Sequence, residues 1–223
     1  MSDNKAFSTY AITVYFDDDT TTAIRQLTAQ LADITGNDYM TANSVPPHLT
    51  LGMFHAGDAD VGKLKTQFEA FVSAVREGDF SFDLSFSGYE SFLDKVIFIK
   101  PALSEELCKF NELLHERFLP HFEPADNRNY LPGNWYPHIA LGVKLSHEQF
   151  EKGMEFLKGY DAQGIGGAPE AATGLSEARE AAGGDSRNPA KPGLPSGRCA
   201  RITTIGLACC NPYTRILDLV TRI

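Results

Sequence analysis

The sequence predicts an α+β fold in which two pseudo-symmetric lobes with antiparallel sheets line a central cleft. One observation is a repeated pattern, written "PPHLTLGMF" at residues 46–54 and "YPHIALGVK" at residues 136–144. A second is the periodicity around each copy, where segments with helical and strand spacing follow one another in a similar order. We therefore expect a single bilobal domain over residues 1–223, with one motif strand from each lobe in a shared cleft.

The first copy lies among segments with clear periodicity. β-branched and aromatic residues predict a strand over residues 10–16, and apolar residues at helical spacing predict a helix from 20 to about 34. A second helix is expected over residues 59–76, where apolar side chains again recur every three or four positions. The alternating segment "FSFDLSF" and the run "KVIFIK" each predict a strand.

The second copy lies between two further helices. An apolar stripe predicts a helix over residues 104–118 with Ser104 as its N-cap, and Ser146 is expected to cap a helix that runs to about Lys158. The chain then ends in two predicted strands about an Asn-Pro-Tyr turn, within "RITTIGLACCNPYTRILDLVTRI". This order of elements is compatible with one sheet or with two.

One stretch departs from this plan. Residues 161–200 hold 8 of the 19 glycines and 4 prolines, and they contain no aromatic residue. Such a composition buries too little apolar surface to offset the entropy of ordering the chain. We therefore expect a flexible, low-complexity insertion here.

Composition and charge limit the classes of function. With 43% apolar residues, the 223-residue chain can bury a sizeable core. Its formal net charge of -9 argues against an extended nucleic-acid surface, but it is compatible with a small nucleotide or an RNA end. We recognise no secretory signal, membrane span or cysteine spacing typical of zinc or disulfides, so the expectation is a cytoplasmic monomer with reduced thiols and no membrane partner.

Strand parity sorts each copy of the pattern into two faces, because residues two apart in a strand share a face. The apolar face of the first copy carries Leu49, Leu51 and Met53. The opposite, cleft-facing set is predicted to be His48, Thr50, Gly52 and Phe54 in the first copy and Tyr136, His138, Ala140, Gly142 and Lys144 in the second. The two glycines leave that face without bulk, where a ligand is expected to approach closely.

Two histidines that face one another across a cleft indicate acid–base chemistry. An imidazole changes charge near neutral pH, so His48 and His138 can act as general acid and general base in one displacement. A hydroxyl two residues later, such as that of Thr50, can donate a hydrogen bond to a phosphoryl oxygen. A cyclic phosphodiester suits this arrangement, since one histidine activates water while the other protonates the departing ribose oxygen.

At these residues the sequence resembles the two-histidine phosphoesterase superfamily, which includes RNA ligase-like proteins and cyclic nucleotide phosphodiesterases. Members carry two copies of His-x-Thr/Ser-x in a bilobal α+β fold, and the copies here are "HLTL" at 48–51 and "HIAL" at 138–141. The resemblance implies that His48 and His138 are the acid–base pair and that Thr50 binds phosphate. It also implies chemistry without a metal or other cofactor.

Ala140 departs from the family pattern, because it has no hydroxyl to donate. Loss of one preorganised donor costs roughly 100- to 1000-fold in turnover. A backbone amide, a water or Lys144 could supply the missing donor. Two hypotheses follow: a metal-independent phosphodiesterase acting on a 2',3'-cyclic nucleotide, a related cyclic phosphate or an RNA end, and a noncatalytic protein that binds a nucleotide or RNA end.

The other residues of the motifs have two interpretations each. Tyr136 and Phe54 could stack on a base or simply pack, and Lys144 could bind phosphate or end a solvated strand. A zinc site would need a further ligand, and neither motif carries a Cys, Asp or Glu. We expect local or surface hydrogen bonding from the remaining histidines, which are His55, His115, His121 and His147.

Overall fold

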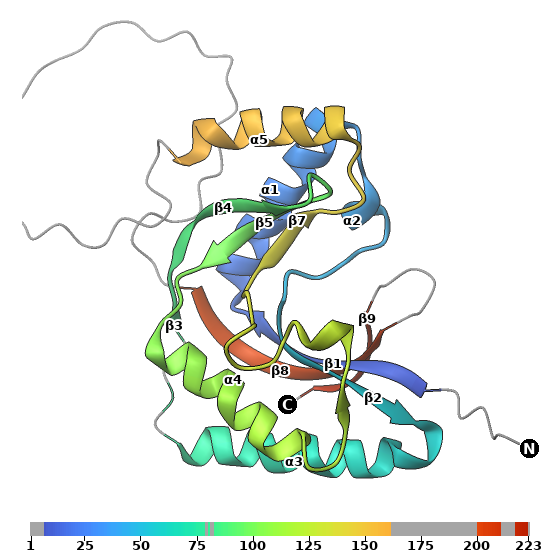
Figure 1. Cartoon of the computed structure of the whole chain (residues 1–223). Helices are drawn as coiled ribbons and strands as arrows, with labels where there is room; N and C mark the ends of the chain where they lie inside the picture. Colours follow the sequence, from blue (N-terminus) through green and yellow to red (C-terminus); the bar gives the residue numbers. More distant parts are fainter. Residues whose placement is uncertain (1–6, 79, 81–82, 162–199, 211–216, 223) are drawn as a thin grey trace, which may run out of the picture.

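The computed structural model describes every residue except 1–6, 79, 81–82, 162–199, 211–216 and 223. It has the predicted α+β architecture, with two antiparallel sheets in two lobes (Figure 1). The insertion predicted at 161–200 lies outside the described residues, apart from its two end positions.

The strands are β1 (Phe7–Phe16), β2 (Leu49–Gly57), β3 (Asp83–Leu84), β4 (Phe86–Phe92), β5 (Val96–Pro101), β6 (Glu123–Pro124), β7 (Ile139–Gly142), β8 (Ala200–Cys210) and β9 (Leu217–Arg222). The helices are α1 (Asp18–Thr35), α2 (Tyr39–Ala42), α3 (Val61–Glu77), α4 (Glu105–Phe118) and α5 (His147–Asp161), with short 3-10 turns at Asp58–Asp60 and Asp126–Arg128. The other helices and strands expected from periodicity are present, but the strand expected over "FSFDLSF" (80–86) is only partly found: within it, β3 covers two residues and β4 begins at its last residue. Residues 81–82 and the predicted Asn-Pro-Tyr turn lie outside the described residues. Most of β4, together with α2, β6 and the two 3-10 turns, is additional.

The first lobe is built on the larger sheet, which has the order β3-β8-β1-β2-β6, with β9 paired to β8. Helices α3 and α4 lie side by side against this sheet (Figure 1). Their inward faces are aromatic, and the Phe71 and Phe110 rings stack with centroids 5.4 Å apart. Burial of such side chains, each worth roughly 1.5–3 kcal/mol, holds the helices onto the sheet that contains the first motif.

The second lobe is built on the sheet β4-β5-β7 and is covered by α1 and α5 (Figure 1). Helix α5 approaches α1 and β5 closely at Gly153, where an added Cβ would lie 2.7 Å from Ile97 Cδ1 and 3.1 Å from Leu31 Cδ1. A glycine at this position therefore allows the helix to pack directly on the sheet that contains the second motif.

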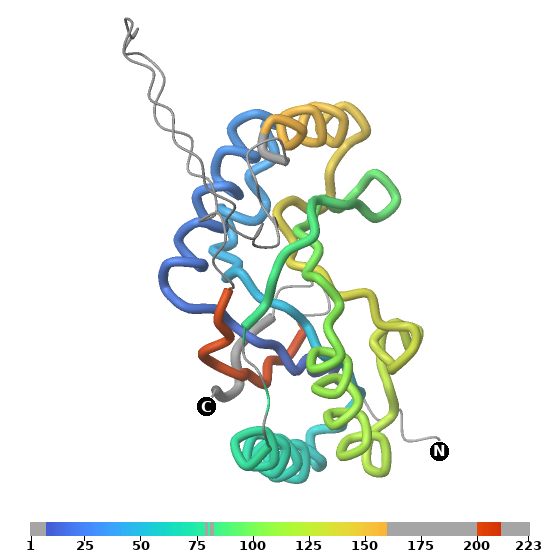
Figure 2. Tube along the Cα trace, turned by 90° about the vertical axis from the view of Figure 1, so that its left-hand side faces the viewer, coloured from blue at the N-terminus to red at the C-terminus, as the bar shows by residue number. Residues whose placement is uncertain are grey.

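The two lobes exchange helices along the chain. Helix α1 follows β1 of the larger sheet yet covers the smaller one, whereas α4 follows β5 of the smaller sheet and packs on β2 (Figures 1 and 2). Strands β8 and β9 then return to the larger sheet. Each lobe is thus completed by segments from both halves of the chain, and this connectivity fixes the two motif strands relative to each other.

Capping side chains set the helix ends. The Ser104 hydroxyl accepts a hydrogen bond from Leu107 N (3.1 Å), as the sequence predicted. At the start of α5, Ser146 Oγ accepts from Gln149 N (3.2 Å) while Gln149 Oε1 accepts from Ser146 N (2.9 Å), so the two residues form a capping box.

In the described part of the chain, no helix is both long enough and apolar enough to cross a membrane.

Candidate active site

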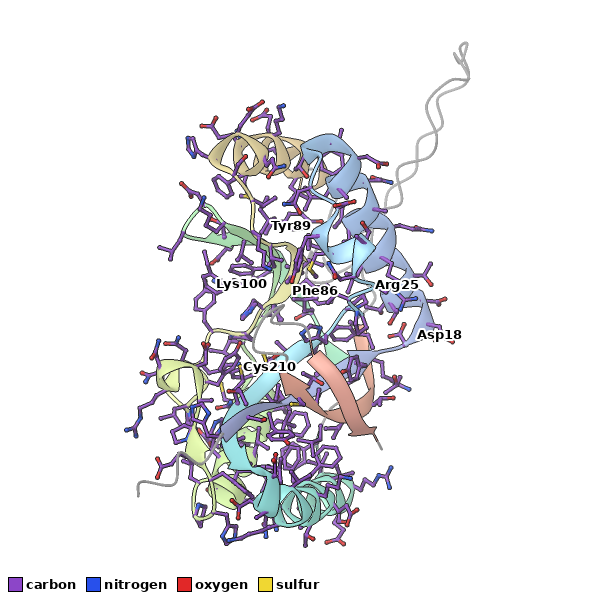
Figure 3. All side chains as sticks on the ribbon, turned by 90° about the vertical axis from the view of Figure 1, so that its right-hand side faces the viewer. Asp18, Arg25, Phe86, Tyr89, Lys100 and Cys210 are labelled. Atoms are coloured by element: carbon purple, nitrogen blue, oxygen red, sulfur yellow. The ribbon has the colours of Figure 1, made fainter. Side chains whose placement is uncertain are left out.

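The two motifs line one cavity of about 570 Å³ between the lobes. His48 lies directly before β2 and Thr50 near its start, and His138 lies directly before β7 and Ala140 near its start. Cys210, at the end of β8, lines the cavity from the larger sheet (Figure 3). The structure therefore brings together the two histidines and the threonine that the sequence singled out.

Each motif strand contains a β-bulge at the same position. In the pairing of β1 with β2, Ile12 is opposite Gly52 and Thr13 is opposite Thr50, so Leu51 has no partner residue. In the pairing of β5 with β7, Ile97 is opposite Gly142 and Phe98 is opposite Ala140, so Leu141 is left over. A bulge inserts one extra residue and reverses the alternation of side chains beyond it.

The bulge corrects the parity prediction for Phe54. Its side chain is 0% exposed and stacks on the Phe118 ring in the core, with ring centroids 4.8 Å apart. Met53, which was expected on the apolar face, lines the cavity instead, and so does Val143 in the second copy. Phe54 therefore lies in the core and not on the cavity wall, because the bulge turns it toward α4.

The bulge also changes the interpretation of the two glycines. A Cβ added at Gly52 would lie 2.8 Å from Leu114 Cδ2, and one added at Gly142 would lie 3.3 Å from Leu31 Cδ2. Both positions thus face helices in the core, and the prediction that they open the cleft to a ligand was wrong. Their small size instead allows helices to pack closely behind the bulges.

Both imidazoles are held in the same way. His48 Nδ1 lies 2.8 Å from the Pro46 carbonyl oxygen, and His138 Nδ1 lies 2.9 Å from the Tyr136 carbonyl oxygen. A carbonyl oxygen can only accept, so Nδ1 is the protonated nitrogen in each ring. The lone pair of each neutral imidazole is therefore on Nε2, and either ring can take or give a proton at that atom.

The electrostatic surroundings of the two histidines differ. Burial lowers the pKa of His48; the hydrogen bond to Pro46 opposes this shift, and the charge of His138 adds to it. Burial also lowers the pKa of His138, where the hydrogen bond to Tyr136 and the carboxylate of Asp126 oppose the shift. Both rings are therefore biased toward the neutral form.

Lys144 lines the cavity, as expected. It lies after the end of β7, and its backbone φ is 56°, so strand alternation does not determine the direction of its side chain. Its Nζ lies 4.1 Å from the centroid of the Tyr39 ring, a cation–π distance. Lys95 also lines this cavity, so two cations and one carboxylate, that of Asp126, are found on its wall.

Tyr136 does not line the cavity, which corrects its predicted place. Its side chain is 40% exposed, its hydroxyl donates to Glu90 Oε2, and Lys100 Nζ lies 5.1 Å from its ring centroid (Lys100 is labelled in Figure 3). The segment before β7 is not a regular strand, so alternation does not carry Tyr136 onto the same face as His138. The Phe92 and Phe98 rings contact both the Tyr136 and the His138 side chains.

Groups that the sequence did not indicate donate hydrogen bonds to backbone carbonyl oxygens of β2. Trp135 Nε1 donates to the Thr50 carbonyl oxygen (3.0 Å), and Asn111 Nδ2 donates to the Leu51 carbonyl oxygen (2.7 Å). The Ala125 N–H donates to the Met53 carbonyl oxygen (2.8 Å). Trp135 thus packs against the core and also binds the backbone of the first motif.

Among the described residues, we find no group of three or more His, Cys, Asp or Glu side chains that could hold a metal ion. Metal-independent chemistry remains a prediction.

A family model described as the 2'-5' RNA ligase superfamily matches residues 16–164, which include both motif strands. Among solved structures, the chain is similar to Usb1 from Kluyveromyces marxianus, solved with uridine monophosphate. The identity is 12%, the match covers 70% of this chain and 80% of that chain, and the TM-score is 0.36. No curated protein sequence matches this chain.

Proposed function

Because the chain belongs to the 2'-5' RNA ligase superfamily, a family of two-histidine phosphoesterases, we propose that it hydrolyses a 2',3'-cyclic nucleotide, a related cyclic phosphate or an RNA end without a metal. The observation that carries this proposal is the pair of imidazoles on one cavity, each with Nδ1 bonded to a carbonyl and Nε2 left for proton transfer. Such a pair can supply both proton transfers of a displacement at phosphorus.

Substrate size and charge are consistent with this assignment. A cavity of about 570 Å³ is within the usual range for small-molecule sites, roughly 300–1,000 Å³. Lys95 and Lys144 on its wall can balance the charge of a phosphate, and the Thr50 hydroxyl can donate to a phosphoryl oxygen. Neither the cavity nor the net charge of -9 favours a long nucleic acid as the ligand.

A second candidate function is noncatalytic binding of a nucleotide or RNA end. Ala140 favours it, because this side chain lines the cavity at the place where the family pattern has a hydroxyl. A protein that lacks one donor can keep the binding site and lose most of its turnover.

The deciding experiment screens the wild-type chain against the four 2',3'-cyclic nucleotides and a short RNA that ends in a cyclic phosphate, in the presence of a chelator. We expect turnover that falls at least about 100-fold in His48→Ala and in His138→Ala, because each removes a proton-transfer group. His121→Ala, a change at an exposed histidine outside the cavity, is the matched control. Binding measured by calorimetry without turnover would favour the noncatalytic function, and activity that survives both replacements would overturn the assignment.

A further inference from the structure

A second cavity, of about 330 Å³, adjoins the active-site cavity. The two cavities share three lining residues, Met40, Val45 and Ala140, so a ligand held at the histidines can extend into the second cavity. Helix α1 forms one wall of the second cavity with Thr28 and with Arg25, which is labelled in Figure 3. These two residues are three positions apart, so they lie on one face of the helix.

Helix α2 and the turn after it form another wall. This short helix contacts α1 and β7 (Figure 1). Ser44 N donates to the Thr41 carbonyl oxygen and Val45 N donates to the Met40 carbonyl oxygen, both at 3.0 Å, and Ser44 has a φ of 51°. All four residues line the second cavity, so backbone hydrogen bonds hold this wall in place.

The two threonine hydroxyls on these walls are left as hydrogen-bond acceptors. Thr28 Oγ1 donates to the Ile24 carbonyl oxygen and Thr41 Oγ1 donates to the Asp38 carbonyl oxygen, both at 2.9 Å. A carbonyl oxygen can only accept, so the single proton of each hydroxyl is used within the chain. Each oxygen keeps its lone pairs and can accept a hydrogen bond from an N–H group of a ligand.

Arg25 supplies the complementary groups. A guanidinium has N–H donors and no acceptor. The side chain is exposed, and among the described residues we find no hydrogen bond or ion pair to it. Together with the two threonines, Arg25 gives the second cavity both donors and acceptors.

This combination does not suit a second phosphate. A phosphate offers oxygen acceptors, which leave the two threonine oxygens without a donor. Half of the lining is also apolar, namely Met40, Val45, Pro47 and Ala140. A nucleobase matches such a lining, because it has flat faces that pack on apolar groups and edges that both donate and accept.

The two acceptors favour a base that carries an amino group. An amino group has two N–H bonds and can donate one to each of Thr28 and Thr41. Adenine, cytosine and guanine carry such a group, and uracil does not. Guanine also has O6 and N7 acceptors next to each other, which an arginine can bind with two parallel hydrogen bonds.

We propose that the second cavity binds the base of the substrate and selects a base with an exocyclic amino group, guanine above all. This inference rests on the proposed function, which places the phosphate of a nucleotide beside His48 and His138. Arg25, Thr28 and Thr41 are then the residues that determine base specificity.

Calorimetric titration with nucleoside 3'-monophosphates tests the site without turnover. We expect guanosine 3'-monophosphate to bind about tenfold more tightly than uridine 3'-monophosphate, because its base edge matches the donors and acceptors of the second cavity. Inosine 3'-monophosphate lacks only the amino group and should bind more weakly than the guanosine compound. Equal affinities for the guanosine and inosine compounds would overturn the assignment.

Arg25→Met keeps a long apolar side chain and removes the donors. We expect this change to weaken the binding of guanosine 3'-monophosphate about tenfold and to weaken that of the 7-deazaguanosine analogue, which has no N7, less. Arg76→Met, at an exposed position on α3 outside both cavities, is the matched control and should change neither affinity. Tighter binding of guanosine 3',5'-bisphosphate than of the monophosphate, lost in Arg25→Met, would identify a second phosphate site and overturn the base assignment.

Thr41→Val removes one acceptor and keeps the branched shape. It should weaken the binding of guanosine 3'-monophosphate and leave that of inosine 3'-monophosphate nearly unchanged, because only the first has an amino group to donate. Thr66→Val, at an exposed position on α3, is the control. Equal losses for the two ligands would contradict a contact between Thr41 and the amino group.

Turnover separates a failure of this inference from a failure of the proposed function. Selective binding of the guanosine compound without turnover of any 2',3'-cyclic nucleotide would support the base site and overturn the proposed hydrolysis. Equal kcat/KM on all four 2',3'-cyclic nucleotides, unchanged by Arg25→Met, would overturn the base site and leave the proposed function in place.

Discussion

The motif strands β2 and β7 have similar backbone conformations, but they differ in their side chains and in their neighbours. Both contain a bulge at the third residue after the histidine, and in both the Nδ1 of that histidine is bonded to the carbonyl two residues earlier. They differ at the second residue after the histidine, which is Thr50 in one copy and Ala140 in the other. The two copies thus have the same local backbone conformation, and they differ in the side chain at the second residue after the histidine.

The neighbours of the two strands differ as well. β2 lies inside the larger sheet and accepts side-chain hydrogen bonds from Trp135 and Asn111, whereas β7 lies at the edge of the smaller sheet. The carboxylate of Asp126 opposes the lowering of the pKa of His138, whereas the charge of His138 adds to the lowering of the pKa of His48. Under the proposed function, these differences predict that the two copies contribute unequally to activity, and variants of each copy can test that prediction.

Replacement of Thr50 by Val should give the largest effect. The change removes the hydroxyl and keeps the branched shape, so the first half-site comes to resemble the second. We expect kcat/KM on a 2',3'-cyclic nucleotide to fall roughly 100- to 1000-fold, because a preorganised donor is lost from the reacting centre.

Thr66→Val, at an exposed position on α3, is the control for this change of side chain. Unaltered activity in Thr50→Val would show that the two half-sites do not differ in the way proposed.

The bulge glycines should respond unequally to replacement by Ala. At Gly52 an added Cβ would lie 2.8 Å from Leu114 Cδ2, 3.1 Å from Phe54 Cε2 and 3.2 Å from His115 Cε1, all in the core. Overpacking of this kind costs about 1–3 kcal/mol of unfolding free energy. At Gly142 the nearest atom is Leu31 Cδ2 at 3.3 Å, and the smaller clash is offset by the reduced entropy of the unfolded chain.

Urea unfolding of Gly52→Ala and Gly142→Ala measures this difference directly. Equal destabilisation of the two variants would mean that the cores behind the two bulges are equally tight, contrary to the structure.

The sequence predicted the elements and the first half of each motif because both depend on local periodicity. Parity correctly placed His48, Thr50, His138 and Ala140 on one cavity, since all four precede the bulges. It failed for Phe54, because a bulge arises from pairing with another strand and has no local signature.

Long-range connections were likewise beyond the sequence pattern. Periodicity identified helices α1 and α4 but could not show that each packs on the sheet of the other lobe. The hydrogen bond from Trp135 to Thr50 spans 85 positions, so no local pattern indicates it. The turn at Asp126–Arg128 had a signal in "DNR", because Asp and Asn tolerate its positive φ, but its position on the cavity depends on the fold.

A hydroxyl introduced at position 140 should raise turnover. Ala140 lines both the active-site cavity and a second cavity of about 330 Å³, so there is room for a larger side chain. We expect Ala140→Thr to increase kcat on a 2',3'-cyclic nucleotide by roughly tenfold, because the new donor acts on charge that develops in the transition state. Ala140→Ser should help less, since Thr is the stiffer side chain.

The gain should vanish when Ala140→Thr is combined with His138→Ala. A wild-type enzyme that is already efficient and gains nothing from Ala140→Thr would show that another donor fills this position.

A pH dependence of stability that differs between the two copies should be the weakest of these effects. Burial lowers the pKa values of His48, His115 and His138 in the folded chain. Above the unfolded value of about 6.5, all three are neutral in both states. As pH falls below that value, the unfolded chain binds protons that the folded chain does not, so the free energy of unfolding decreases. Carboxylates titrate mainly below this window.

Chemical denaturation at pH 7.5 and pH 5.5 should therefore show a lower free energy of unfolding at the lower pH. Each histidine can contribute at most about 1.4 kcal/mol to this decrease for every unit by which folding lowers its pKa. His48→Gln should flatten this dependence more than His138→Gln, because Asp126 opposes the lowering of the pKa at His138 and nothing comparable acts at His48. In the Asp126→Asn background the two replacements should become more nearly equal. A larger flattening by His138→Gln in the wild-type background would contradict the electrostatic difference between the two half-sites.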